Sequence, residues 1–539
     1  MNLEDPNRWY LLAQQLKAVM PECLVIAGMC AVLLATLMRR DRVKLPLLLA
    51  MISLASAFVM ALGMLASPQT VQGAIFSGMA VIDPFSQFFK VLILLVAMVV
   101  VCLWLLFSQT RTPEQDVPDY LCLLLGATLG MMMMTSASNL LMIFLALESA
   151  SLPSYVLAGF RKRSRMGSEG SLKYVIFGSA ASAVTLYGMS LIYGVTGHLQ
   201  LSHIAAVMSE QGVSPLLAVG LLSLMAGIGF KLASIPMHFW TPDVFQGAPI
   251  EVATLLAIAS KGAAVCLLVR ILQSFSAAST GEHSYDLAIM CSLGLLGSAT
   301  ATWGNLVALR QTNIRRLLAY SSIAHAGYLM MASSVILMVA ADDQAKLRTL
   351  SGDILFYLLV YVFMNLGAFT VAGLIAMHER TNDIRQYAGL IRRNPLLAVL
   401  MVVFMLSLFG MPGLGGFMGK IFIASQMFAA GPLGYVLIAI LLFNTLLSFA
   451  YYLRPGYYMI VTSPAGGEAS QARWSAGAPA TVILLLCAIV LVWTGLLPGS
   501  IQRMTHDLGR IDPVLASTPE QPASSQGQWR VINPDNSHE

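Results

Sequence analysis

Five titratable side chains stand inside long apolar segments of this sequence, where a charge is hard to solvate. They are Glu148 in "FLALESASLPSY", Lys231 in "GIGFKLASIPMHFW", Lys261 in "ASKGAAV", His325 in "RRLLAYSSIAHAGY" and Lys420 in "GLGGFMGKIF". An ionisable residue at the centre of a membrane helix costs about 2.5–3.5 kcal/mol even on a lenient insertion scale, so each one needs a reason. Carboxylate, amine and imidazole groups can all take up and release protons. A set of them at similar depth is what a proton path across a bilayer requires.

Helix geometry predicts that three of these groups, Glu148, Lys261 and His325, lie in the middle third of the membrane. At about 1.5 Å per residue, Glu148 is about 20 Å from Arg161, Lys261 about 18 Å beyond Pro249, and His325 about 15 Å beyond Arg315. Helical spacing also places Ser321, His325 and Tyr328 on one face. A structural alternative stays open, because a buried Glu–Lys pair can simply tie two helices together and a buried histidine is often a packing residue.

Other charged residues in apolar segments have simpler interpretations. Lys90 and Arg270 are close to segment ends, so snorkelling to the interface accounts for them. Glu22 and Glu251 stand in expected first turns, where the helix dipole favours an acid. The seven cysteines show no CxxC spacing, which argues against a disulfide framework or an iron–sulfur ligand set.

The elements that must position these groups are membrane helices. The chain has 539 residues, of which 57% are hydrophobic and 11% charged. Its apolar residues form blocks of about 20, the length of one membrane-spanning helix. We therefore expect an all-α polytopic membrane protein with about 14 helices. The blocks are centred near residues 29, 55, 96, 127, 149, 184, 224, 261, 294, 327, 364, 411, 443 and 488.

Two of the predicted helices should be broken. Pro236 follows Lys231 in helix 7, and Pro412 with a glycine cluster precedes Lys420 in helix 12. Broken helices at matching positions in two halves indicate inverted repeats, which would here be helices 4–8 and 9–13. The expected organisation is an N-terminal unit 1–118, repeats 119–275 and 286–454, a final helix 477–498 and a loosely ordered polar tail 499–539.

Lysine and arginine predict the orientation. By our count, 19 of them fall in odd-numbered connections, and only Lys346 and Arg348 fall in even-numbered ones. By the positive-inside rule, odd connections face the cytoplasm and both termini face the opposite side. The net charge of +5 is therefore a topology signal and gives no reason to expect nucleic acid binding.

The sequence also resembles a known family. Four stretches carry the likeness: "LESASLPSYVLAGF" with the following "SLKYVIFGSAASAVTLYG", "GFKLASIPMHFWTPDVFQGAP", "ASKGAAV" and "RRLLAYSSIAHAGYLM". They resemble the proton-conducting membrane subunits shared by respiratory complex I and multisubunit cation/proton antiporters. Within that group, the chain is most similar to the subunit N branch of bacterial NADH-quinone oxidoreductases. The resemblance covers roughly residues 20 to 500.

That resemblance implies roles for individual residues. Glu148 would be the modulating acid of helix 5, Lys231 the pumping lysine of helix 7, Lys261 the connecting lysine of helix 8 and Lys420 the lysine of helix 12. His325 matches the family's polar helix 10 only loosely, and the Ser149–Ala150 pair after Glu148 departs from the bulkier residues expected there. The family pattern also implies two inverted five-helix repeats.

The resemblance further implies an assembly. The chain itself would bind no cofactor, while FMN, iron–sulfur clusters and quinone would belong to partner subunits of a multi-pass complex in the bacterial inner membrane. The expected partners are other membrane subunits, a peripheral redox arm and lipids. Two alternatives remain: a subunit of an Mrp-type Na⁺/H⁺ antiporter or membrane-bound hydrogenase, and a structural scaffold subunit with buried ion pairs.

Overall fold

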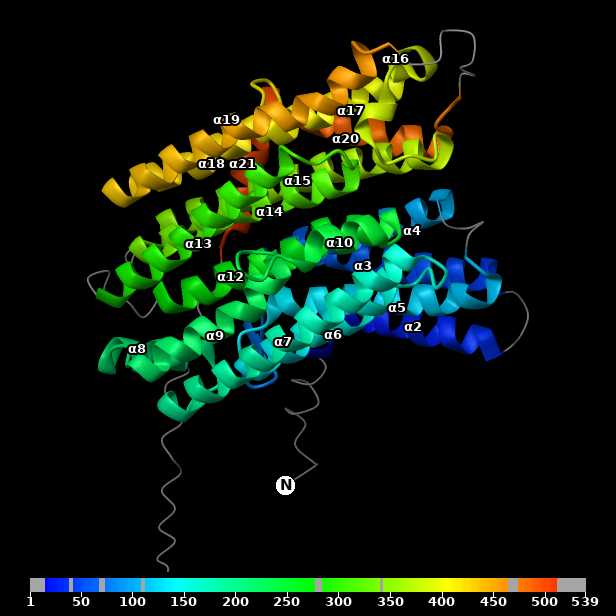
Figure 1. Cartoon of the computed structure of the whole chain (residues 1–539). Coiled ribbons are helices and arrows are strands. Elements are labelled where there is room, and N and C mark those ends of the chain that lie inside the picture. The colour runs from blue at the N-terminus through cyan, green and yellow to red at the C-terminus, as the bar shows by residue number, and fades with distance from the viewer. Residues whose placement is uncertain are drawn as a thin grey trace, which may run out of the picture.

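The computed structural model describes residues 15–37, 42–66, 73–107, 112–276, 284–339, 343–463 and 474–510. Within these ranges, 13 helices are long and apolar enough to cross a membrane. The predicted helix 12 is present as two shorter helices. The helices run side by side in one bundle (Figure 1). An all-helical membrane fold follows from the lack of water in a bilayer, because each backbone N–H and C=O must then bond within its own helix. The predicted fold class is confirmed.

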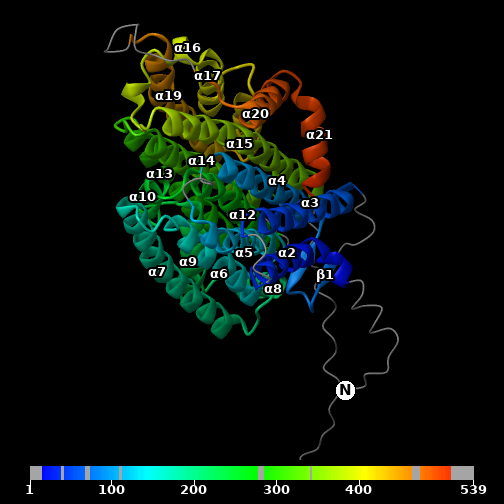
Figure 2. The ribbon, with the colours of Figure 1, turned by 90° about the vertical axis from the view of Figure 1, so that its right-hand side faces the viewer.

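The N-terminal unit contains three membrane helices and a short hairpin. The helices are α2 (Met20–Leu37), α3 (Lys44–Ala66) and α4 (Pro84–Phe107). Strands β1 (Gly73–Ile75) and β2 (Ala80–Ile82) pair antiparallel between α3 and α4, with Ala74 opposite Val81. Helix α2 packs against α3 and also against α5, so this unit is joined to the rest of the bundle (Figure 2).

The next unit contains a broken helix. Its elements are η2 (Glu114–Asp116), α5 (Val117–Ser136), α6 (Leu140–Ala158), α7 (Arg165–Thr196), α8 (Leu201–Gln211), α9 (Pro215–Leu232), α10 (Trp240–Gly247), α11 (Ile250–Leu255), the π-helical turn η3 (Leu256–Ser260) and α12 (Lys261–Ser276). Helix α9 ends one residue after Lys231, and residues 233–239 are not helical before α10 begins. The break predicted just after Lys231 is therefore present.

The third unit contains the second broken helix. It runs through α13 (Ser284–Ala308), α14 (Ile314–Ser334), η4 (Val335–Met338), α15 (Gln344–His378), η5 (Ile384–Tyr387), α16 (Leu390–Arg393), α17 (Pro395–Phe409), α18 (Gly415–Ala429) and α19 (Pro432–Ile460). The gap between α17 and α18 contains Gly410 and Gly413 at φ of +94° and +90°. Glycine tolerates such values, so the glycine cluster turns the chain between the two halves.

The C-terminal part differs from the expected tail. After α20 (Ala478–Leu496), residues Pro498–Leu508 form helix α21, whereas the sequence predicts a loosely ordered segment from residue 499. Helix α21 packs against α15 and α4 and lies across their direction (Figure 2). Its apolar residues Ile501 and Leu508 explain the packing. The remainder of the predicted tail, 511–539, lies outside the described residues.

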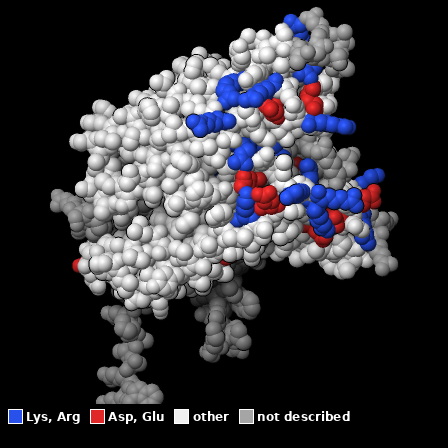
Figure 3. Space-filling view, viewed as in Figure 1, with Lys and Arg blue, Asp and Glu red and all other residues white. Residues whose placement is uncertain are grey.

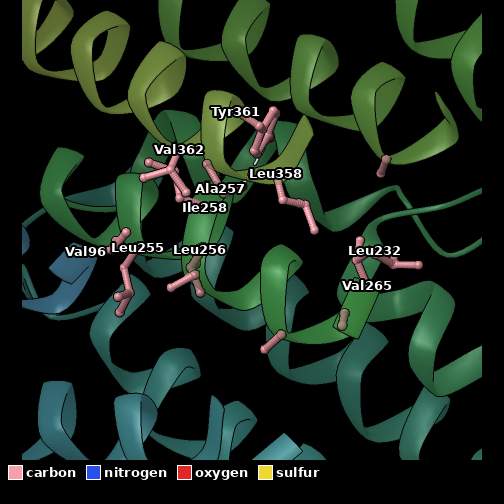
Figure 4. Packing of buried hydrophobic residues seen from close by; sticks show 14 of the residues in the cluster. Val96, Leu232, Leu255, Leu256, Ala257, Ile258, Val265, Leu358, Tyr361 and Val362 are labelled. Atoms are coloured by element: carbon pink, nitrogen blue, oxygen red, sulfur yellow. Dashed lines mark hydrogen bonds between the residues drawn. The ribbon is translucent and has the colours of Figure 1, made fainter. Parts of the chain in front are cut away.

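Three helical segments form a buried spine through the bundle. Nearly all residues of three apolar stretches are buried: the segment α11–η3–α12, helix α14 and helix α15. In α2, α3, α7 and α20, by contrast, 33% of the apolar stretch is buried. The π-helical turn lies at the centre of this spine (Figure 4). There the hydroxyl of Tyr361 on α15 donates to the backbone carbonyl of Ala257, 3.2 Å away. A π-helical turn shifts the backbone hydrogen bonds by one residue, and such turns are frequent at functional sites.

Charged side chains gather at one end of the molecule. In Figure 3, lysine, arginine, aspartate and glutamate lie together at the right-hand end, while the long flanks are almost uncharged. At this charged end, Asp243 on α10 binds Lys173 at 2.7 Å and Arg316 at 2.6 Å. The connections that carry most of the positive charge are therefore on one face, as the positive-inside pattern requires.

Candidate functional site

Glu148 and Lys231 line one small cavity. Glu148 stands in the middle of α6 and accepts a hydrogen bond from Ser182 on α7. Lys231 lies in the last turn of α9 with 2% of its surface exposed. The cavity between them, of about 10 Å³, is also lined by Ser151 and Thr185. This is about the space that one water molecule occupies.

The two groups do not form a direct hydrogen bond. The Nζ of Lys231 has no hydrogen-bond partner among the described residues. Glu148 is instead held by the Ser182 hydroxyl, and Lys231 lies in the last turn of α9. A single water in the shared cavity could bridge them, which makes the pairing reversible. The arrangement differs from a fixed ion pair that ties α6 to α9.

The helix break beside Lys231 is held by specific contacts. Ala233 adopts a left-handed conformation at φ +59°, and the indole of Trp240 donates to the carbonyl of Phe230, in the last turn of α9, at 3.1 Å. The backbone N–H of Ile235 donates to the Thr300 hydroxyl at 3.0 Å. These bonds satisfy the polar groups that the break leaves open. Lys231 is therefore positioned by a well-bonded turn.

Lys261 lies at the junction of the π-helical turn and α12. Its Nζ donates to the hydroxyl of Ser322 on α14 at 2.7 Å, and only 2% of the residue is exposed. The structure thus connects Lys261 to α14 by a hydrogen bond.

His325 is bonded through both ring nitrogens. Its Nδ1 lies 2.6 Å from the Tyr357 hydroxyl, and its Nε2 lies 3.1 Å from the Tyr452 hydroxyl. Ser321, one turn earlier on α14, also bonds the Tyr452 hydroxyl. The predicted face of Ser321 and His325 therefore meets a tyrosine from α19. A histidine between two hydroxyls can exchange protons in either direction, depending on its tautomer.

Lys420 bonds to the open end of the preceding half-helix. Its Nζ donates to the carbonyl oxygen of Phe409 at 2.7 Å and approaches that of Leu408 at 3.4 Å. The ammonium group also lies 5.2 Å from the centre of the Tyr328 ring. Tyr328 in turn accepts a hydrogen bond from Asn305, 2.8 Å away. Lys420 therefore joins the polar cluster around His325.

The structure sorts the five predicted residues into two groups. Lys261, His325 and Lys420 belong to one polar cluster around α14, because Lys261 bonds Ser322 and Lys420 lies over the ring of Tyr328, each three residues from His325. Glu148 and Lys231 form the second group around their own cavity. Sequence reasoning missed the tyrosines that bond His325, because Tyr357 and Tyr452 stand in apolar segments far along the chain. Only their hydroxyl groups signal a polar role.

The interpretation of Lys90 and Arg270 as snorkelling residues is wrong. Lys90 is fully buried and forms an ion pair with Glu22 at 2.7 Å. Arg270 is 2% exposed and binds both carboxylate oxygens of Asp83, at 2.9 and 3.0 Å. A buried charge is stable only when it is paired and hydrogen-bonded. The sequence did contain a signal for these ion pairs, since Glu22 and Asp83 are acids at the start of predicted helices and could partner a buried cation.

Comparison with known proteins identifies the family. A family model for the transmembrane part of NADH:quinone oxidoreductase and Mrp antiporter subunits matches residues 137–448, which include all five site residues. The chain belongs to this family. The resemblance inferred from sequence stretches is thereby confirmed.

Members of the NADH:quinone oxidoreductase and Mrp family match nearly the whole chain. NADH-quinone oxidoreductase subunit N of Anoxybacillus flavithermus is 36% identical over 501 residues, which cover 91% of this chain and 96% of that protein. NAD(P)H-quinone oxidoreductase subunit 2 of Thermosynechococcus vestitus is 35% identical over 539 residues, which cover 97% and 98%.

Solved structures of the family have the same fold. A chain of respiratory complex I from Thermus thermophilus is 33% identical with a TM-score of 0.72, and the match covers 90% of this chain and 98% of that one. A chain of the Mrp complex from Dietzia sp. has a TM-score of 0.78 at 19% identity, over 92% and 97%. The second likeness shows the fold alone.

Proposed function

We propose that this chain is subunit N of a bacterial NADH-quinone oxidoreductase and carries protons across the membrane. Partner subunits would transfer electrons from NADH to quinone and drive the translocation. The observation that carries the proposal is a set of titratable groups on the membrane helices of the family region. Lys231, Lys261, His325 and Lys420 are buried, and Glu148 is half-buried beside the cavity that it shares with Lys231. Such groups are rare within membrane helices and mark ion pathways.

The geometry suggests how protons move. When Lys231 carries a proton, a water in the shared cavity couples it to the carboxylate of Glu148. If the charge on Glu148 is withdrawn, burial disfavours the ammonium form and Lys231 releases its proton. Lys261 can then pass a proton through the Ser322 hydroxyl toward His325, which stands one turn further on α14.

Lys420 would control the far end of the cluster. Its ammonium group is held by the carbonyl end of α17, where the helix dipole favours a cation. A positive charge on Lys420 would repel a second positive charge in the polar cluster around His325. A charge that arrives on Lys420 would therefore favour the departure of a proton from the neighbouring titratable group. The five residues act as a series of coupled sites.

The remaining elements of the proposal concern the assembly. FMN, the iron–sulfur clusters and quinone belong to partner subunits, and this chain contributes translocation alone. It resides in the bacterial inner membrane, contacts lipids and other membrane subunits, and joins the redox arm through them. The charged end in Figure 3 faces the cytoplasm, so both termini lie on the opposite side. We retain the inverted repeats, helices 4–8 and 9–13, as part of this proposal.

The scaffold interpretation has less support at the predicted site. Buried ion pairs that could tie helices together do occur, between Glu22 and Lys90 and between Asp83 and Arg270. They involve α2, α4 and α12, whereas Glu148 on α6 and Lys231 on α9 share a cavity without a direct bond. A tie between α6 and α9 would require such a bond.

Purification from the native membrane tests the assembly directly. The protein would carry an affinity tag at its C-terminus and be extracted in mild detergent. We expect flavin, iron–sulfur clusters and NADH-quinone reductase activity to copurify with it. Copurification of small hydrophobic subunits without any redox centre, together with sodium-dependent transport, would instead support an Mrp-type antiporter.

A further inference from the structure

A buried carboxylate on α15 stands outside the five predicted residues. Asp353 has 1% of its surface exposed, and both of its carboxylate oxygens are hydrogen-bonded. Oδ2 accepts from Gln426 on α18 at 2.6 Å. Oδ1 accepts from Gln502 at 3.3 Å and lies 2.8 Å from Nε2 of His506, both on α21. Amide groups and one imidazole thus surround this acid, and the imidazole can exchange protons.

Asp353 is one helical turn from the polar cluster. Tyr357, whose hydroxyl lies 2.6 Å from Nδ1 of His325, is four residues further on α15. Residues four apart share a face of a helix, at a separation of about 6 Å along its axis. A proton would cross such a gap by way of an intervening water molecule. The two groups therefore belong to one polar face of α15.

His506 connects this acid to the surface. Its side chain is 29% exposed, whereas that of Asp353 is 2% exposed. Helix α15 ends at His378, near the charged face. Asp353 lies 25 residues before that end and 9 residues after the start of the helix. The pair is thus at the end of the bundle opposite the lysine- and arginine-rich face. A buried acid bonded to a half-exposed imidazole is a suitable last step for a proton that leaves the protein.

Helix α21 is held tightly over this acid. A Cβ atom on Gly352 would come within 2.6 Å of the His506 backbone, and one on Gly509 within 2.5 Å of the Arg348 carbonyl oxygen. Glycine at these positions lets the two backbones approach closely. The approach places the His506 ring against Asp353 and closes the acid off from bulk water, except through the imidazole.

We propose that Asp353 and His506 form the outlet of the proton path, reached from His325 through Tyr357. This inference rests on the proposed function and adds its exit. A proton from His325 passes by way of the Tyr357 hydroxyl to the Asp353 carboxylate. The acid then protonates Nε2 of His506, and the proton on Nδ1 of that ring leaves to water. Every proton taken up by Asp353 is released by His506, and no redox step is involved.

The test uses the intact complex in proteoliposomes, with NADH-driven acidification of the lumen as the readout. Asp353→Asn keeps the size of the side chain and one acceptor oxygen but cannot carry a proton. We expect it to slow proton delivery about tenfold or more, since a positioned acid–base group typically contributes about 10²- to 10⁴-fold. Asp353→Glu should retain more pumping than Asp353→Asn, because it restores the carboxylate.

The matched control is Asp507→Asn, the same exchange at an exposed neighbour on α21. It should pump normally. Subunit composition and flavin content confirm assembly of each variant. Pumping of Asp353→Asn within about twofold of the parent would overturn the outlet, given that even the low end of acid–base contributions is about 10²-fold. Equal losses in the Asn and Glu variants would also overturn it, because they would indicate a purely structural anchor for α21.

Lys231→Met separates this inference from the proposed function. Loss of pumping in Lys231→Met with normal pumping in Asp353→Asn would refute the outlet alone. Normal pumping in both variants would refute the proposed function as well. His506→Gln provides a second measurement, since it keeps a hydrogen-bonding amide beside Asp353 and removes the titratable ring. We expect it to slow proton release in the same direction as Asp353→Asn.

Discussion

Lys420 binds the open carbonyl end of α17, with its Nζ 2.7 Å from the carbonyl oxygen of Phe409. Phe409 is the last residue of that half-helix, so its carbonyl has no partner within the helix. A broken helix thus creates the acceptor that holds a cation within the membrane. The partner is a fixed backbone dipole, which stabilises the proton-bearing form of the lysine without a second titratable group.

This geometry predicts the effect of Lys420→Met. The substitution keeps the length of the side chain and removes the charge, so the far end of the cluster can no longer repel a proton from His325. We expect the complex to assemble and NADH-driven pumping to fall by about tenfold or more, as for loss of a proton-transferring group. Pumping in proteoliposomes measures this. An unchanged rate would show that Lys420 is only a packing residue.

Gly410 should be sensitive to a methyl group for two reasons. Its φ is +94°, and an added Cβ would lie 3.2 Å from Cδ of Lys420. Gly410→Ala should therefore lower the apparent melting temperature of the complex, since such backbone strain costs about 1–3 kcal/mol, and also reduce pumping by displacing the lysine. Gly431→Ala is the control, with φ +76° and open space around it. It should reduce stability alone, and an equal loss of pumping in both would contradict the account.

Glu148→Gln tests whether the acid acts by its charge. Gln keeps the hydrogen bond to Ser182 and the lining of the cavity but cannot be ionised. We expect pumping to fall while assembly is preserved, because Lys231 loses the carboxylate that stabilises its proton. Ser182→Ala is the comparison and should have a smaller effect, since it removes one hydrogen bond and no charge. A larger effect of Ser182→Ala would favour a structural role for this pair.

The buried pair of Asp83 and Arg270 should govern stability. Removal of one partner leaves an uncompensated buried charge, which typically costs about 3–5 kcal/mol. Asp83→Asn should therefore reduce the yield and thermal stability of the assembled complex. The double variant Asp83→Leu with Arg270→Met removes both charges and should recover part of that loss. A double variant that is less stable than Asp83→Asn would contradict this explanation.

Cysteine labelling checks the orientation. Asp507 on α21 and Arg163 in the connection after α6 are both exposed, at opposite ends of the bundle. A membrane-impermeant maleimide should label Asp507→Cys on intact spheroplasts and Arg163→Cys only on inverted vesicles. The labelled peptide identifies the site by mass spectrometry, because native cysteines are also present. The reverse pattern would invert the topology.

Most of the fold could be predicted from the sequence, because the bilayer imposes its dimensions on each apolar block. The breaks after Lys231 and before Lys420 were also predictable from proline and glycine. Helix α21 was missed, since its residues 498–508 are polar in composition and their order depends on packing against Gly352. The polar segment offers no hydropathy signal for such packing.

The candidate site was predictable in part. Charges in apolar blocks identified the five residues, but depth along a helix does not say which neighbours they meet. Contacts such as His325 with Tyr357 join residues from different helices, and one sequence carries no information on them. The pairing of Lys90 with Glu22 was missed for the same reason, since position near a segment end favoured snorkelling.

Proton translocation through Lys231 is the central claim, and one measurement tests it most directly. The complex that contains Lys231→Met would be purified, reconstituted in proteoliposomes and compared with the parent for acidification per NADH oxidised. We expect normal subunit composition and flavin content with proton pumping lost or strongly reduced. An assembled Lys231→Met complex that pumps at the parent's rate would contradict the account.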